Sequence, residues 1–163
     1  MRTMIISMAL GAALVATGSA QAATCWDKTS YEAAQLRDFD TMLMVATLRC
    51  RINSVDFSDD YNRFVRDKRP ILAQANIDIR AQFARTVGEA QSLGAYDDFM
   101  TKVANGYGGG SEHMTCADYA AMAKSAADAS SVRSDLVDLA AQSGAQPLVP
   151  GNRCGIIVAM NEK

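Results

Sequence analysis

The segment YEAAQLRDFDTMLMVATLRCR, residues 31–51, decides the fold class of this chain of 163 residues. Apolar side chains recur in it every three or four residues, which predicts one helix with an apolar stripe that faces a core. The stripe consists of Leu36, Phe39, Leu43, Ala46 and Cys50. Three further side chains, Met42, Met44 and Leu48, widen this stripe, and we expect them to fill the core as well.

Helical periodicity continues through most of the chain after this first segment. A second helix is expected over residues 58–88, with a kink or break near Arg69, because Pro70 lacks a backbone donor and clashes with the preceding turn. Gly88 and Gly94 bracket the linker that follows. Three shorter helices are expected at residues 95–106, 115–129 and 131–144. The predicted fold is therefore all-α, a four- or five-helix bundle.

Residues 1–22 have the layout of a secretory signal peptide. Arg2 precedes a short apolar run, and the triplet Ala20-Gln21-Ala22 supplies the small residues that a signal peptidase recognises. The apolar run is shorter than the roughly 20 residues that a membrane-spanning helix needs. We therefore expect export to the periplasm or the outside of the cell. Residues 23–163 would then form a single helical domain with no membrane span.

Four cysteines follow the predicted cleavage site, at Cys25, Cys50, Cys116 and Cys154. An even number of cysteines in an oxidising compartment predicts two disulfides. Their wide spacing is not that of a metal site, so we expect no metal and no other cofactor. A helix over residues 31–51 is about 30 Å long, which keeps Cys25 and Cys50 too far apart to pair. Of the two pairings left, we favour Cys50–Cys116 with Cys25–Cys154, which suits an up-and-down bundle.

The net charge of −2 and the scarcity of catalytic motifs exclude several functional classes. A nearly neutral chain lacks the basic surface of a general nucleic-acid binder, so we expect no nucleic-acid partner. The one histidine, His113, lies in a glycine-rich loop, and no G-x-S-x-G motif accompanies it. We therefore predict no catalytic residue, and the sequence leans away from an enzyme.

Two groups of polar residues are candidates for binding a partner. On the second predicted helix, Arg63 and Arg66 share a face and could hold an anionic group or an acidic partner. The same residues could instead form ordinary ion pairs on a solvated face. The second group combines Asn105 and Tyr107 with the backbone amides of residues 108–110 as a small polar site. The candidate binding residues are Tyr61, Asn62, Arg63, Arg66, Asn105 and Tyr107.

Paired carboxylates offer a catalytic alternative. They occur at Asp38/Asp40, Asp59/Asp60 and Asp97/Asp98. Glycosidase-type hydrolysis uses two carboxyl groups about 5 to 10 Å apart across a cleft. Asp59 and Asp60 are also explained by the dipole of a helix that begins just before them. The alternative function is therefore a small envelope hydrolase that uses paired carboxylates near the 105–110 loop.

The Cys25-Trp26 dipeptide near the predicted mature start and four short stretches carry a resemblance to known sequences. The stretches are MLMVATLRCR at residues 42–51, DYNRFV at 60–65, ANGYG at 104–108 and TCAD at 115–118. With them, most of the mature chain resembles a group of small exported bacterial proteins with four cysteines and no established activity. Members sometimes carry the label S-adenosylhomocysteine hydrolase, an enzyme whose dinucleotide fold needs a G-x-G-x-x-G turn that this sequence lacks. No catalytic residue is therefore carried over.

These features favour a non-enzymatic binding or structural component of the cell envelope. Its partner would be an envelope component or another protein. A chaperone-like role is a third possibility, and it would need an exposed apolar groove lined by Met42, Met44 or Met100.

Overall fold

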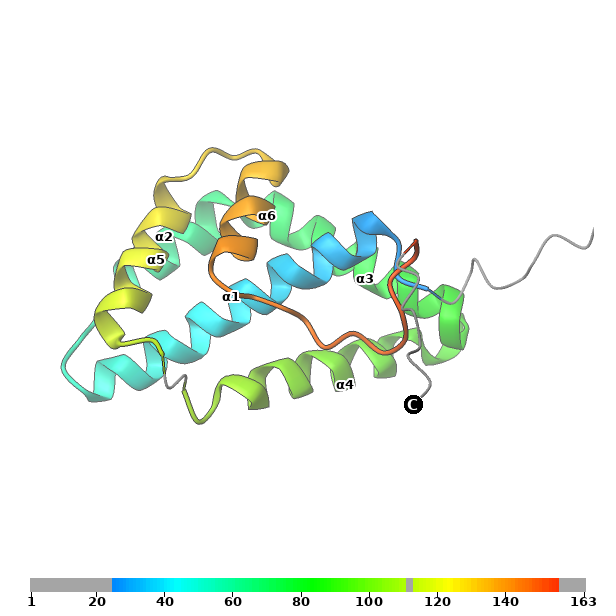
Figure 1. The fold of residues 1–163 in the computed structure, drawn as a ribbon, viewed down its shortest axis with the longest axis horizontal. Coiled ribbons are helices and arrows are strands. Elements are labelled where there is room, and N and C mark those ends of the chain that lie inside the picture. Colours follow the sequence, from blue (N-terminus) through cyan, green and yellow to red (C-terminus); the bar gives the residue numbers. More distant parts are fainter. Residues whose placement is uncertain (1–24, 111–112, 156–163) are drawn as a thin grey trace, which may run out of the picture.

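The computed structural model describes residues 25–110 and 113–155, and the signal peptide expected at residues 1–22 lies outside them. Six helices form in the described ranges and pack as a bundle (Figure 1). They are α1 (Lys28–Ile52), α2 (Ser58–Asp67), α3 (Arg69–Val87), α4 (Glu89–Tyr107), α5 (Cys116–Asp128) and α6 (Arg133–Gln142). The expected all-α fold is confirmed, with one helix more than predicted. None of these six helices is long and apolar enough to cross a membrane.

Helix α1 is the centre of the bundle and contacts each of the other five described helices. Leu36, Phe39 and Leu43 are fully buried, as their spacing predicted. Because neighbours cover α1 on several sides, burial extends beyond this stripe to polar positions, among them Asp38 and Asp40. The longest helix therefore carries two carboxylates inside the bundle.

Two of the three residues expected to widen the apolar stripe do not fill the core. Met42 is 3% exposed and lies in the core, but Met44 is 39% and Leu48 55% exposed. The prediction was wrong for these two because they lie on the part of α1 that its neighbours leave open. Met42 and Met44 thus differ in burial.

The second predicted helix breaks where its proline predicted. Helix α2 ends at Asp67, Lys68 adopts a non-helical conformation, and Pro70 lies in the first turn of α3. A proline is well tolerated there, because the first backbone N–H groups of a helix have no partner within it. The break divides one predicted helix into two, and this accounts for the additional helix.

The linker expected between Gly88 and Gly94 does not form, which corrects the prediction for this region. Gly88 alone separates α3 from α4, with a φ of 88° that favours glycine. Gly94 is an interior residue of α4, and a Cβ at this position would meet nothing within 4 Å. One glycine suffices to reverse the chain, and the other is a helical residue on an exposed surface.

Two disulfides tie together segments far apart in the sequence. Cys50, near the end of α1, is bonded to Cys116, the first residue of α5, with a Cα–Cα distance of 5.5 Å. Cys25 is bonded to Cys154 with a Cα–Cα distance of 5.1 Å. This is the pairing that the sequence favoured.

Residues 145–155, which we call the C-terminal strap, return the chain from α6 to the start of α1. Figure 1 shows this segment, orange to red, crossing α1 and running beside α4. Trp26 and Arg153 form an isolated parallel bridge, in which the Trp26 N–H donates to the Asn152 carbonyl at 2.8 Å. The Cys154 N–H donates to the Trp26 carbonyl at 2.9 Å. Together with the Cys25–Cys154 bond, these contacts fix the far end of the strap.

Candidate functional site

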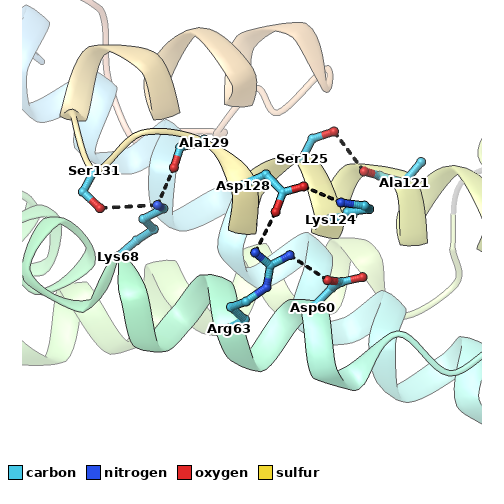
Figure 2. Close-up of polar contacts among 9 residues, drawn as sticks. All are labelled: Asp60, Arg63, Lys68, Ala121, Lys124, Ser125, Asp128, Ala129 and Ser131. Atoms are coloured by element: carbon cyan, nitrogen blue, oxygen red, sulfur yellow. Dashed lines mark hydrogen bonds and ion pairs between the residues drawn. The ribbon is translucent and has the colours of Figure 1, made fainter.

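Arg63, the central residue of the first predicted binding group, joins α2 to α5 through ion pairs (Figure 2). Its guanidinium donates to Asp128 Oδ1 at 2.6 Å and to Asp60 Oδ1 at 3.0 Å. Lys124 also pairs with Asp128. Hydrogen bonds from Lys124 and Arg63 hold the pKa of the Asp128 carboxyl below its ordinary value. The positive charge of Arg63 is therefore paired with two carboxylates of the same chain.

The neighbouring Lys68 is buried at the same helix pair. It is 4% exposed, and its Nζ donates to the Ala129 carbonyl, at the end of α5, and to Ser131 Oγ at 3.3 Å (Figure 2). Carbonyl groups at the end of a helix lack partners within it and carry partial negative charge. Lys68 supplies the missing donor, so it too serves the packing of α2 against α5.

The other members of this predicted group are separated by the fold. Arg66 pairs with its neighbour Asp67 at 3.2 Å, and Asn62 is exposed. Tyr61 faces α1, where its hydroxyl donates to Asp40 Oδ1 at 3.1 Å. This part of the chain therefore presents ion-paired side chains rather than a set of cations directed at one point.

Asp40 occupies a fully satisfied buried position. Besides the Tyr61 hydroxyl on Oδ1, it accepts a short ion-paired hydrogen bond on Oδ2 from the Arg37 guanidinium. Burial raises the pKa of the Asp40 carboxyl, and Arg37 and Tyr61 oppose this rise. Each of its oxygens has a donor.

Asp38 lies two residues earlier on α1 and has one donor only. The Tyr107 hydroxyl, from the end of α4, donates to Asp38 Oδ1 at 3.0 Å. Its Oδ2 is buried and has no hydrogen-bond partner in the described part of the chain. Desolvation by burial raises the pKa of the Asp38 carboxyl to about 6, against the smaller opposing effect of the Tyr107 hydrogen bond. A buried acceptor without a partner is rare enough in folded proteins to need an explanation.

A cavity of about 410 Å³ lies against Asp38, between α1, α4 and the C-terminal strap. We call it the strap cavity. It is lined by Asp38, Phe99, Lys102, Val103, Gly106, Tyr107, Gln146 and Leu148. Its volume falls within the range of small-molecule sites, about 300 to 1,000 Å³, and such sites combine apolar walls with a few polar groups. Asp38 is the buried polar residue of this lining.

The strap that closes one side of this cavity is anchored at both ends. At its start, Ala145 is fully buried, and its carbonyl accepts a hydrogen bond from Gln35 Nε2 at 2.9 Å. At its far end, Trp26 Nε1 donates to the Pro150 carbonyl at 2.8 Å. Between these anchors, Leu148 borders the cavity yet is 94% exposed. The strap therefore contributes a largely exposed side chain to the cavity wall.

A second hollow, of about 510 Å³, lies around Lys28, Tyr31 and Arg153. Its charged groups already have partners within the chain. Lys28 pairs with Glu32 at 3.6 Å, and the Arg153 guanidinium lies 3.7 Å from the centre of the Tyr31 ring. We therefore regard the strap cavity, which is lined by Asp38, the residue with the buried acceptor that lacks a described partner, as the candidate functional site.

The strap cavity includes part of the second predicted binding group. Tyr107 lines it and orients Asp38, whereas Asn105 is exposed and outside the lining. Asp38 is also the one carboxylate that lines it, so no complete pair from the three predicted carboxylate pairs is present there. Asp97 and Asp98 are exposed on α4, inside the helix rather than in its first turn.

The sequence marks Asp38 as a member of a carboxylate pair, but it also carries a stronger signal for this residue. Ala34 and Met42 lie four residues before and after it, and both are buried. Residues four apart share a helix face, so an aspartate between two core positions marks a buried carboxyl. Chemically, a carboxyl with a pKa of about 6 can accept a cation or exchange a proton near neutral pH.

Comparison with known proteins gives no match to a family model, a curated protein or a solved structure. The resemblance to exported four-cysteine proteins therefore stays an expectation, and functional inference depends on the geometry of the strap cavity.

Proposed function

We propose that this chain is an exported, non-enzymatic binding protein of the cell envelope, periplasmic or secreted, and that it holds a small, largely apolar molecule in the strap cavity. The observation that carries this proposal is Asp38, a buried carboxyl with one oxygen that has no partner among the described residues, beside a cavity whose walls are partly apolar. A ligand that donates a hydrogen bond to it would remove the cost of that buried acceptor.

The composition of the cavity supports binding over chemical conversion. Phe99 and Val103 are buried apolar side chains of α4, and Leu148 adds apolar surface from the strap. The polar members are one carboxyl, one phenol, one amide and one ammonium group. Apolar walls supply most of the affinity for a small ligand, and a few polar groups fix its orientation.

Two features support the envelope as the place of action. Both disulfides join distant parts of the chain, and such bonds form and persist in oxidising compartments. The start of the sequence has the layout of a signal peptide. These features are independent, since one concerns the folded domain and the other the segment before it.

Binding can be tested with N-phenyl-1-naphthylamine, a neutral apolar dye whose fluorescence rises in apolar surroundings. Gly106 lines the cavity, and a Cβ there would meet nothing within 4 Å, so Gly106→Leu can occupy the cavity without a clash at its Cβ. Gly94→Leu is the matched control, because Gly94 lies on the same helix with equally open space and outside the cavity lining.

We expect the wild type and Gly94→Leu to bind the dye with equal affinity, and Gly106→Leu to bind it at least tenfold more weakly. Equal affinity for all three proteins, or no binding to the wild type, would overturn the proposed function.

A further inference from the structure

Asp38 and Asp40, the two buried aspartates of α1, have similar hydrogen-bond partners except at Oδ2. Asp38 and Asp40 are 4% and 6% exposed, and each accepts a tyrosine hydroxyl on Oδ1, at 3.0 and 3.1 Å. On Oδ2, Asp40 has the Arg37 guanidinium. Asp38 has no donor on Oδ2 among the described residues. The position that is without a donor at Asp38 is thus the one that a cation, the Arg37 guanidinium, occupies at Asp40.

The described residues do not supply this cation. None of the ion pairs among the described residues involves Asp38. Lys102 lines the same cavity but does not form an ion pair with Asp38. A buried carboxylate without a counter-charge is costly, and pairing it with a hydrogen-bonding cation removes most of that cost. A neutral donor would satisfy the hydrogen bond but leave the charge without compensation.

The geometry points to a ligand with one amino group on an apolar body, in which the ammonium pairs with Asp38 and the body packs against Phe99, Val103 and Leu148. This inference rests on the proposed binding function and names the ligand class. The ammonium would take the place beside Asp38 that the Arg37 guanidinium holds beside Asp40.

The cavity also limits the ligand to a single positive charge. Lys102 also lines the cavity, so a ligand with two positive charges would be repelled more strongly by this like charge than a ligand with one. The strap members of the lining, Gln146 and Leu148, carry no charge that could compensate. A diamine should therefore bind more weakly than a monoamine of the same shape.

Protonation of Asp38 should compete with the amine. The groups near Asp38 are Tyr107 and Lys102 on α4, and Arg37 and Asp40 on its own helix; Tyr119 of α5 interacts electrostatically with Tyr107. Burial and the Asp38 charge raise the pKa of Tyr107, so its hydroxyl stays a donor at neutral pH. Because burial brings the pKa of Asp38 to about 6, its carboxylate is lost when the pH falls from 7.5 to 5.

The test compares 2-phenylethylamine with 2-phenylethanol, which has the same shape and no charge, and with a para-aminomethyl derivative of the amine that carries two charges. Dissociation constants are measured by NMR titration for the wild type, for Asp38→Asn and for Asp97→Asn. Asp38→Asn keeps an acceptor for Tyr107 and the shape of the side chain. Asp97→Asn removes the same charge from an exposed position of α4.

For the wild type and Asp97→Asn, we expect the amine to bind at least tenfold more tightly than the alcohol and than the diamine. In Asp38→Asn the advantage over the alcohol should vanish. The amine affinity of the wild type should fall at least threefold between pH 7.5 and 5, while that of Asp38→Asn should not change. The wild-type pH dependence provides a test that needs no variant to fold.

Equal binding of amine and alcohol to the wild type, or no binding of either, would overturn this ligand class. The naphthylamine dye separates this failure from that of the proposed function. If Gly106→Leu blocks the dye while the amine has no advantage, the strap cavity binds ligands of another class. If Gly106→Leu leaves dye binding unchanged, the cavity is not the binding site.

Discussion

Trp26 Nε1 donates a hydrogen bond to the Pro150 carbonyl at 2.8 Å, which joins a residue two positions before α1 to the C-terminal strap. The indole ring is 1% exposed and packs edge-on against Phe83, with 5.5 Å between ring centres. A second aromatic contact, to Phe99, joins it to α4. One side chain thus links the strap, α3 and the helix that lines the strap cavity.

Trp26→Phe should weaken this anchor. The variant loses the hydrogen bond to Pro150 and leaves space beside Phe83 and Phe99, so we expect the free energy of unfolding to fall by about 1–3 kcal/mol. Because Trp26 is the one tryptophan of the chain, its replacement removes the tryptophan fluorescence signal. The free energy of unfolding is therefore measured by urea denaturation followed by far-UV circular dichroism. Val132→Ala, at an exposed position, should change stability by less than about 0.5 kcal/mol. Equal stability of wild type and Trp26→Phe would contradict the anchoring role.

Asp38 should make the protein less stable as the pH rises. Its pKa is about 6 in the folded chain, against an ordinary value of 3.8, so the folded state binds this proton more tightly than the unfolded state. By linkage, stability then falls between about pH 4 and pH 6 and the loss is complete above that range. Asp38→Asn should remove this loss, so its gain over the wild type grows across the range by on the order of 1–2 kcal/mol.

Urea denaturation at pH 4.5, 5.5, 6.5 and 7.5 checks this expectation. Asp97→Asn serves as the control, because it removes a carboxylate from an exposed position of α4. A stability difference between Asp38→Asn and the wild type that is constant over this pH range would show that burial does not raise the pKa of Asp38.

Lys68 should matter more to stability than the arginine two residues before it. Lys68→Met removes the donor to the Ala129 carbonyl and to Ser131 Oγ, and we expect a loss of about 1–3 kcal/mol. Arg66→Met removes only an exposed pair with Asp67, for which we expect less than about 0.5 kcal/mol. Thermal or urea denaturation compares them, and equal losses would contradict a structural role for the buried ammonium.

The two glycines at the ends of the expected linker should respond in opposite ways to alanine. Gly88 has a φ of 88°, and its Cβ would lie 3.2 Å from Gln91 Oε1, so Gly88→Ala should cost about 1–3 kcal/mol. Gly94 is helical with open space around it, so Gly94→Ala should stabilise the protein by up to about 1 kcal/mol. Urea denaturation measures both, and a loss for Gly94→Ala would mean that the helix does not extend through this position.

Local chemistry explains which parts of the fold were predictable. Pro70 restricts its own backbone wherever it lies, so the break between α2 and α3 followed from the sequence. The length of one helix excluded the pairing of Cys25 with Cys50, and the expected up-and-down bundle favoured the observed pairing over the other one left. Gly94 was misread because a glycine is compatible with a helix, a turn or a linker, and only the path of the neighbouring chain decides between them.

The candidate site was less accessible to sequence reasoning, because burial of a side chain on α1 depends on which neighbours pack against it. Met44 and Leu48 have the spacing of core residues yet lie where the described helices leave them exposed. Asp38 has a polar side chain and is buried because α4 and the strap cover it. Tyr107 was identified as a candidate, but its acceptor lies 69 residues away and could not be assigned from local pattern.

The loop closed by Cys50–Cys116 lies entirely within the loop closed by Cys25–Cys154. A protease that cuts the backbone once anywhere between residues 25 and 154 therefore produces two fragments that stay covalently joined. The nicked molecule would migrate as a single species on a non-reducing gel. A second cut at a suitable position, or a reductant, would be required before any fragment could diffuse away.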